Sequence, residues 1–91
     1  KLQELSDVLI AQGKTSKLEA LKVGALIEEV DIADLLEAME RTTHPDIQSV
    51  YANLLWGSEN HLRAFVFNIK GLSGEPYIAQ KISQEKVDQI L

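Results

Sequence analysis

Two long segments of this chain repeat their apolar residues with the period of an α-helix, and Pro45 begins the second of them. At about 100° per residue, residues 17–41 form one stripe, which consists of Leu18, Leu21, Ala25, Ile32, Leu35, Leu36 and Met39. Residues 45–70 form another, which consists of Ile47, Val50, Tyr51, Leu54, Leu62, Phe65 and Ile69. Because only a short turn separates the segments, they are expected to form an antiparallel hairpin.

Short helices are expected on both sides of this hairpin. Residues 2–12 show helical periodicity and precede Gly13, a typical stop. Gly71 is expected to end the second long helix, and Ser83 to cap a last helix over residues 84–90. No segment alternates as a β-strand does, so the predicted fold class is all-α.

Composition limits the size and the partners of the protein. The chain has 91 residues, which fits one helical domain over residues 1–91. Its net charge of −5 argues against nucleic acid and anionic membrane surfaces, because both attract basic faces. No apolar run approaches the roughly 20 residues of a membrane span. The sequence has no cysteine, which excludes disulfides and thiolate metal sites and is compatible with the cytoplasmic location that we expect.

Polar residues interrupt both apolar stripes near their middles. Glu28 falls inside the first stripe, with Glu29 at its edge, and Ser58 and His61 fall inside the second. In a hairpin that turns near residue 43 or 44, Glu28 and His61 are about equally far from the turn, so we expect them to meet. A buried charge requires compensation. Glu28 and His61 therefore form a structural polar pair, or bind a metal inside a bundle, or lie where the seam is open to water.

A weaker apolar face runs along the other side of each long helix. It consists of Val23, Leu26 and Val30 on the first helix and of Trp56 and Phe67 on the second. One hairpin cannot cover all of these faces, and uncovered apolar patches tend to mark interfaces. We therefore expect a partner subunit or further helices, and the chain is predicted to form a homo-oligomer. The alternative is that the short first and last helices cover these faces within a monomer.

Two strings resemble a known family. VGALIEEVDIADL at residues 23–35 and LLWGSENHLRAF at residues 54–65 resemble the third and fourth helices of a prokaryotic ferritin-like family of unknown function, distantly similar to rubrerythrins and ferritins. The tail from Tyr77 to Glu85 resembles that family's C-terminal end. The resemblance implies the C-terminal half of a four-helix bundle, completed by dimerisation or by a missing N-terminal half. It also implies a site for two metal ions, usually iron or manganese.

The same resemblance implies the site residues. Glu28 and His61 match metal ligands of the family, with Glu29 as a neighbouring candidate. The relatives pair the histidine with a glutamate three residues earlier, and this chain has Ser58 there, so its half-site has one ligand fewer. The implied function is a partial carboxylate–histidine metal site with a metal-handling or redox role. The alternative is a non-catalytic structural or interaction module in which Glu28 and His61 form a buried polar pair.

Overall fold

Three helices make up most of residues 17–91, the part of the chain that the computed structural model describes. They are α2 (Lys17–Arg41), α3 (Pro45–Ser73) and α4 (Gln84–Ile90), and no strand occurs within this range. The predicted all-α fold is confirmed for these residues. The helix expected over residues 2–12, with its stop at Gly13, lies outside them.

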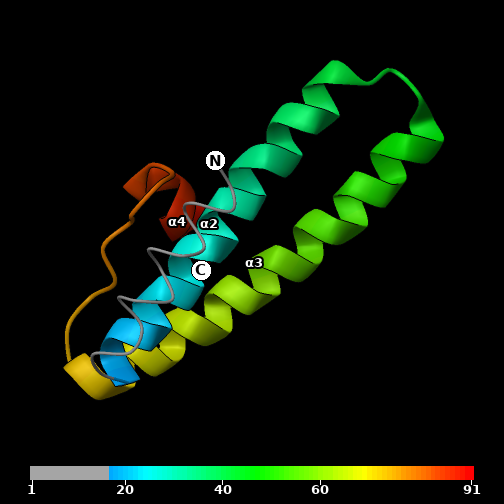
Figure 1. The fold of residues 1–91 in the computed structure, drawn as a ribbon. Helices are drawn as coiled ribbons and strands as arrows, with labels where there is room; N and C mark the ends of the chain where they lie inside the picture. The colour runs from blue at the N-terminus through cyan, green and yellow to red at the C-terminus, as the bar shows by residue number, and fades with distance from the viewer. Residues whose placement is uncertain (1–16) are drawn as a thin grey trace.

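The two long helices form the predicted antiparallel hairpin, with a short turn at residues 42–44 (Figure 1). His44 has an extended backbone, with φ −84° and ψ 116°, as expected before a proline. Its side chain makes no capping hydrogen bond. Gln48 instead closes the turn, since its Nε2 donates a hydrogen bond to the carbonyl of Thr42 at 2.8 Å. The turn therefore lies where helix spacing predicted it.

The helix α3 runs past the stop that its sequence suggested. Gly71 lies within α3, which ends at Ser73. Gly74 adopts the left-handed conformation with φ 70°, and its N–H donates a hydrogen bond to the carbonyl of Lys70 at 2.9 Å. The expectation that Gly71 ends this helix is wrong, because the terminating cap needs a residue with positive φ and Gly74 supplies it.

The core lies in the half of the hairpin away from the turn, where the C-terminal segment covers it. Its members are Ala25 and Ile32 from α2, Leu62, Val66 and Ile69 from α3, and Tyr77, Val87 and Ile90 from the C-terminal segment. Ser83 caps α4 as predicted, because its side chain accepts a hydrogen bond from the N–H of Lys86 at 3.1 Å. Arg63 Nε donates to the carbonyl of Ile90 at 2.8 Å, which ties the end of α4 to α3.

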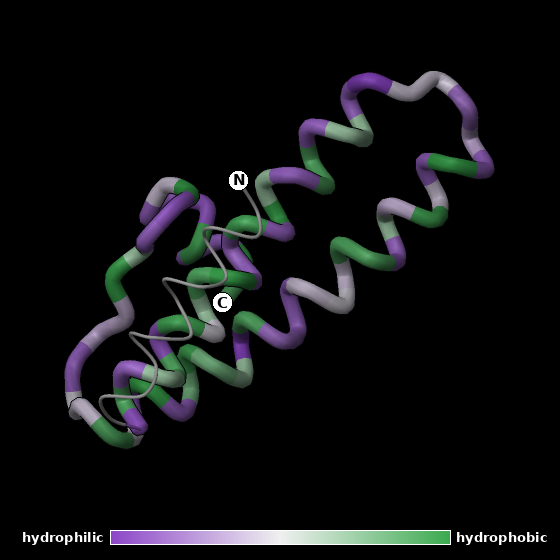
Figure 2. The backbone as a smooth tube through the Cα atoms, viewed as in Figure 1, coloured by the Kyte–Doolittle hydropathy of each residue, from purple (hydrophilic) through white to green (hydrophobic). Residues whose placement is uncertain are grey.

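Several large apolar side chains of α3 are exposed to solvent. Figure 2 shows apolar and polar positions alternating along both long helices as far as the turn. On α3, Val50 is 56% exposed and Leu54 is 53% exposed, and on its other side Trp56 and Phe67 are exposed as well. The described residues, 17–91, leave these side chains exposed. Among residues 17–91, no helix combines the length and the apolar character that crossing a membrane requires.

Candidate functional site

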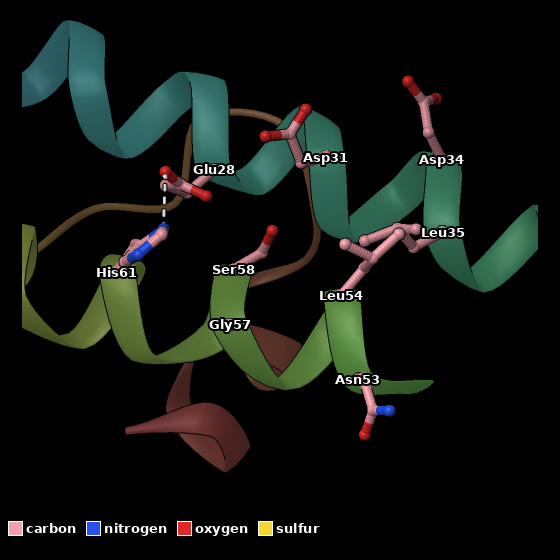
Figure 3. A pocket seen from close by; sticks show the side chains of 9 residues that line it. All are labelled: Glu28, Asp31, Asp34, Leu35, Asn53, Leu54, Gly57, Ser58 and His61. Atoms are coloured by element: carbon pink, nitrogen blue, oxygen red, sulfur yellow. Dashed lines mark ion pairs between the residues drawn. The ribbon is translucent and has the colours of Figure 1, made fainter. Parts of the chain in front are cut away.

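A groove of about 570 Å³ runs between α2 and α3 on the open side of the hairpin (Figure 3). Its lining residues are Glu28, Asp31, Asp34 and Leu35 from α2, and Asn53, Leu54, Gly57, Ser58 and His61 from α3. The groove thus brings three carboxylates and one imidazole to a surface that also carries exposed apolar groups.

Glu28 and His61 meet across this groove, as helix spacing predicted. Glu28 Oε2 lies 3.3 Å from His61 Nδ1 (Figure 3). The Glu28 side chain is 14% exposed, whereas that of His61 is 68% exposed. Within this chain the carboxylate is therefore largely enclosed and the imidazole faces outward. The sequence left three interpretations of this pair open. For His61, the structure agrees with the one in which the side chain is exposed to water.

Two carboxylates of the groove, Glu28 and Asp31, have a negative form that burial disfavours. Loss of hydration on burial raises the pKa of Glu28 above its ordinary value; nearby His61 and a hydrogen bond from Ser58 oppose this rise, and Asp31 adds to it. Burial also raises the pKa of Asp31, and the neighbouring charge of Asp34 raises it further. A raised carboxyl pKa means that the negative form is under-compensated. A cation bound here would relieve that deficit.

Asp31 is a groove carboxylate that the apolar stripes did not reveal, and Asp34 is another. Asp31 follows Glu28 by three residues, so both side chains share one face of α2, and both line the groove. This spacing is visible in the sequence and is the signal that would have found Asp31. Candidate residues were polar residues inside an apolar stripe. Asp31 lies just outside the stripe and was therefore not among them.

The groove has the types of ligand that bind iron or manganese, but too few of them to complete a site. Carboxylate and imidazole groups suit iron and manganese. Protein metal sites have roughly four to six ligands, and no group of three or more His, Cys, Asp or Glu side chains in the described part of the chain is placed to hold an ion. The contact between Glu28 and His61 can therefore supply only part of a site.

Glu29 lies in a different environment from its neighbour Glu28. The sequence placed it at the edge of the stripe, but its side chain is 0% exposed. Its carboxylate accepts hydrogen bonds from the hydroxyl of Tyr77 and from the backbone N–H groups of residues 80–82. These contacts point it away from the groove and occupy its oxygens. The edge position in the stripe did not indicate this complete burial, which arises because the C-terminal segment folds over that side of α2.

The whole chain, residues 1–91, matches a family model described as "Uncharacterized protein domain (DUF2202)". The chain belongs to this DUF2202 family. It is similar to uncharacterized protein MJ0754 of Methanocaldococcus jannaschii, with 45% identity over 91 residues, which are 100% of this chain and 49% of that protein. This DUF2202 chain therefore spans about half the length of the curated relative that it matches.

The helical arrangement of this DUF2202 chain also occurs in a solved structure. The crystal structure of hypothetical protein MJ0754 matches it with a TM-score of 0.90 and 45% identity, over 97% of this chain and 50% of that chain. At this level of identity and overlap, the hairpin and its C-terminal segment are shared by both proteins. The DUF2202 fold is thus shown by the match, and the role of the groove has to be inferred from its chemistry.

Proposed function

We propose that this chain is one half of a ferritin-like four-helix bundle and that Glu28 and His61 contribute to a metal site inside the completed bundle. The observation that carries this proposal is the 3.3 Å contact between the two side chains across α2 and α3, in a groove with under-compensated carboxylates. Iron or manganese suits such donors, and either ion would supply Lewis-acid or redox chemistry there. The lack of cysteine supports action in the cytoplasm.

The protein groups of this half-site have distinct parts to play. His61 turns Nδ1 toward Glu28, so Nε2 is the nitrogen that can bind an ion, and a carboxylate on the other nitrogen is the usual way to orient such an imidazole. Glu28 holds the imidazole from the side of the ring opposite to Nε2, so in this arrangement it would orient the histidine and add negative charge rather than bind the same ion. Ser58 lines the groove with Glu28 and lowers the pKa of that carboxyl, while Asp31 would add negative charge that attracts a cation.

Two further helices are required to complete this site. His61 is 68% exposed and Leu54 beside the groove is 53% exposed, so a covering layer would bury both and bring the missing ligands. A second copy of the chain, in a homo-oligomer, is one source of these helices. A longer chain is the other, and the M. jannaschii relative has about as many residues again outside the matched part.

A second candidate function is a non-catalytic structural or interaction module. It is favoured by one observation, namely that Glu28 already has a protein partner in His61, 3.3 Å away. In that case the pair fixes the register of the two helices. Trp56 and Phe67, which are 67% and 79% exposed, would then be contact residues for a partner.

Metal content separates these two functions. We expect the intact protein, purified after growth with iron and manganese, to contain metal by elemental analysis. Glu28→Gln and His61→Ala should each lower that content by about 10-fold or more, as loss of ligands or of the groups that orient them does. Glu59→Gln and His44→Ala change the same residue types outside the groove and should leave it unchanged. Metal-free wild-type protein, or full metal content in both groove variants, would instead support the structural module.

A further inference from the structure

The buried carboxylate of Glu29 collects the polar contacts of the segment between α3 and α4. Its Oε1 accepts from the backbone N–H groups of Gln80, Lys81 and Ile82 at 3.0, 2.8 and 3.0 Å. Its Oε2 accepts from the Tyr77 hydroxyl and, at 3.1 Å, again from the N–H of Gln80. One side chain thus satisfies three consecutive backbone donors that lie about fifty positions away in the sequence.

This arrangement suits a carboxylate and no other side chain. An ionised carboxylate only accepts hydrogen bonds, through about four lone-pair positions. Successive backbone N–H groups that converge on one point form an anion-binding concavity. A glutamine at position 29 would present an NH₂ group to these donors in place of one oxygen. The chain therefore fills an anion site in its own C-terminal segment with its own side chain.

The segment held in this way closes one apolar face of the hairpin. Tyr77, Val87 and Ile90 belong to the buried core, together with Leu62 of α3. Leu62 is fully buried, while the preceding residue His61 is exposed. The C-terminal segment lies along α2 and α3 in the half of the hairpin away from the turn (Figure 1). Leu62 thus lies on the side of the hairpin that the C-terminal segment covers, and His61, one residue earlier, lies in the groove on the other side.

We propose that residues 77–91 form a strap that the carboxylate of Glu29 locks onto α2. The lock reserves one apolar face of the hairpin for the chain itself and leaves the groove face for further helices. It depends on Glu29 and the backbone of residues 80–82, and not on metal binding. The strap and the metal site can therefore fail independently of each other.

Amide hydrogen exchange of the intact protein tests the lock. In the wild type we expect the N–H groups of residues 80–82 to be protected, and in Glu29→Gln to exchange about 10-fold faster or more, as loss of a charge-assisted hydrogen bond predicts. Glu59→Gln makes the same change on α3, outside the groove and outside these hydrogen bonds, and should leave their exchange unchanged. Equal exchange in the wild type and Glu29→Gln would overturn the proposal. If Glu29→Gln does not fold, the wild-type protein decides: unprotected amides at 80–82 overturn the lock.

Chemical rescue distinguishes the lock from general packing. Glu29→Ala removes the anion and leaves space where it was, so added formate should restore protection at residues 80–82, and the same concentration of chloride should not. A Glu29→Ala protein whose exchange formate does not slow would show that lost packing had opened the segment. That result would contradict an anion lock.

Discussion

Two adjacent carboxylates on α2 differ in almost everything that surrounds them. Glu28 faces the groove, 14% exposed and in contact with His61, whereas Glu29 is fully buried under the C-terminal segment. One residue along a helix turns a side chain by about 100°, which is enough to separate an open groove from a closed core. The same chemical group therefore serves a candidate site at one position and the fold at the next.

The raised pKa of Glu28 predicts how stability changes with pH. A carboxyl whose pKa is higher in the folded state than its ordinary value of 4.5 binds more protons folded than unfolded. Its contribution to the free energy of unfolding is thus full below that value and is lost as pH rises through the raised pKa. For the metal-free protein, we expect Glu28→Gln to flatten this decline in urea unfolding between about pH 4 and 7. Asp31 acts in the same direction, so part of the decline remains.

The control for this titration is Asp46→Asn, which removes an exposed carboxylate in the first turn of α3. This variant should keep the wild-type dependence of unfolding free energy on pH. A Glu28→Gln protein whose decline matches that of the wild type would show that the groove does not perturb Glu28.

At the residue level, the sequence was sufficient to predict the environment of Glu28 but not that of Glu29. Helical period and equal distance from the turn predicted that Glu28 meets His61. The partners of Glu29 are mainly backbone N–H groups. Because almost every residue has such a group, no local sequence pattern predicts which of them Glu29 contacts. Only the path of the C-terminal segment, which is a tertiary property, brings them together.

Among the helices, the close approach of α2 to α3 depends on Gly24. A Cβ atom there would overlap ring carbons of Phe65. Alanine gains about 1 kcal/mol of helix propensity over glycine, but overpacking costs about 1–3 kcal/mol, and Phe65 packs against the core. We expect Gly24→Ala to lower the free energy of unfolding by about 1 kcal/mol. Gly57→Ala, with nothing within 4 Å of the new atom, should raise it, and an equal gain from Gly24→Ala would refute the clash.

The end of α3 gives a matched pair of glycine substitutions. Gly71 is an exposed residue inside the helix with open space around it, so Gly71→Ala should raise the free energy of unfolding by up to about 1 kcal/mol. Gly74 has φ 70°, and Gly74→Ala should lower it by about 1 kcal/mol because a Cβ disfavours that conformation. Thermal or urea unfolding measures both. Effects of the same sign would contradict the assigned helix end.

The sequence predicted the helices better than their ends. Long apolar periodicity and Pro45 located α2, α3 and the turn between them, and Ser83 located α4. Gly71 and Gly74 are both plausible stops from sequence alone, and the choice depends on which backbone takes positive φ. That choice was not encoded in the local pattern of apolar residues.

At the scale of the whole molecule, the hairpin has one face closed by its own C-terminal segment and one face open along the groove. If a second copy covers the open face, light scattering of this chain at high concentration should give the mass of a dimer. Leu54→Glu, which places a charge on that face, should give a monomer. A wild-type chain that stays monomeric would rule out the second copy and leave helices of a longer chain as the cover.

His61 is proposed to bind a metal ion beside Glu28, and pulsed EPR with added Mn²⁺ can detect this binding. We predict that the intact protein shows coupling between the manganese and an imidazole nitrogen, that His61→Ala abolishes this coupling, and that His44→Ala preserves it. Manganese that shows no nitrogen coupling in the wild type, or coupling that survives in His61→Ala, would contradict metal binding by His61.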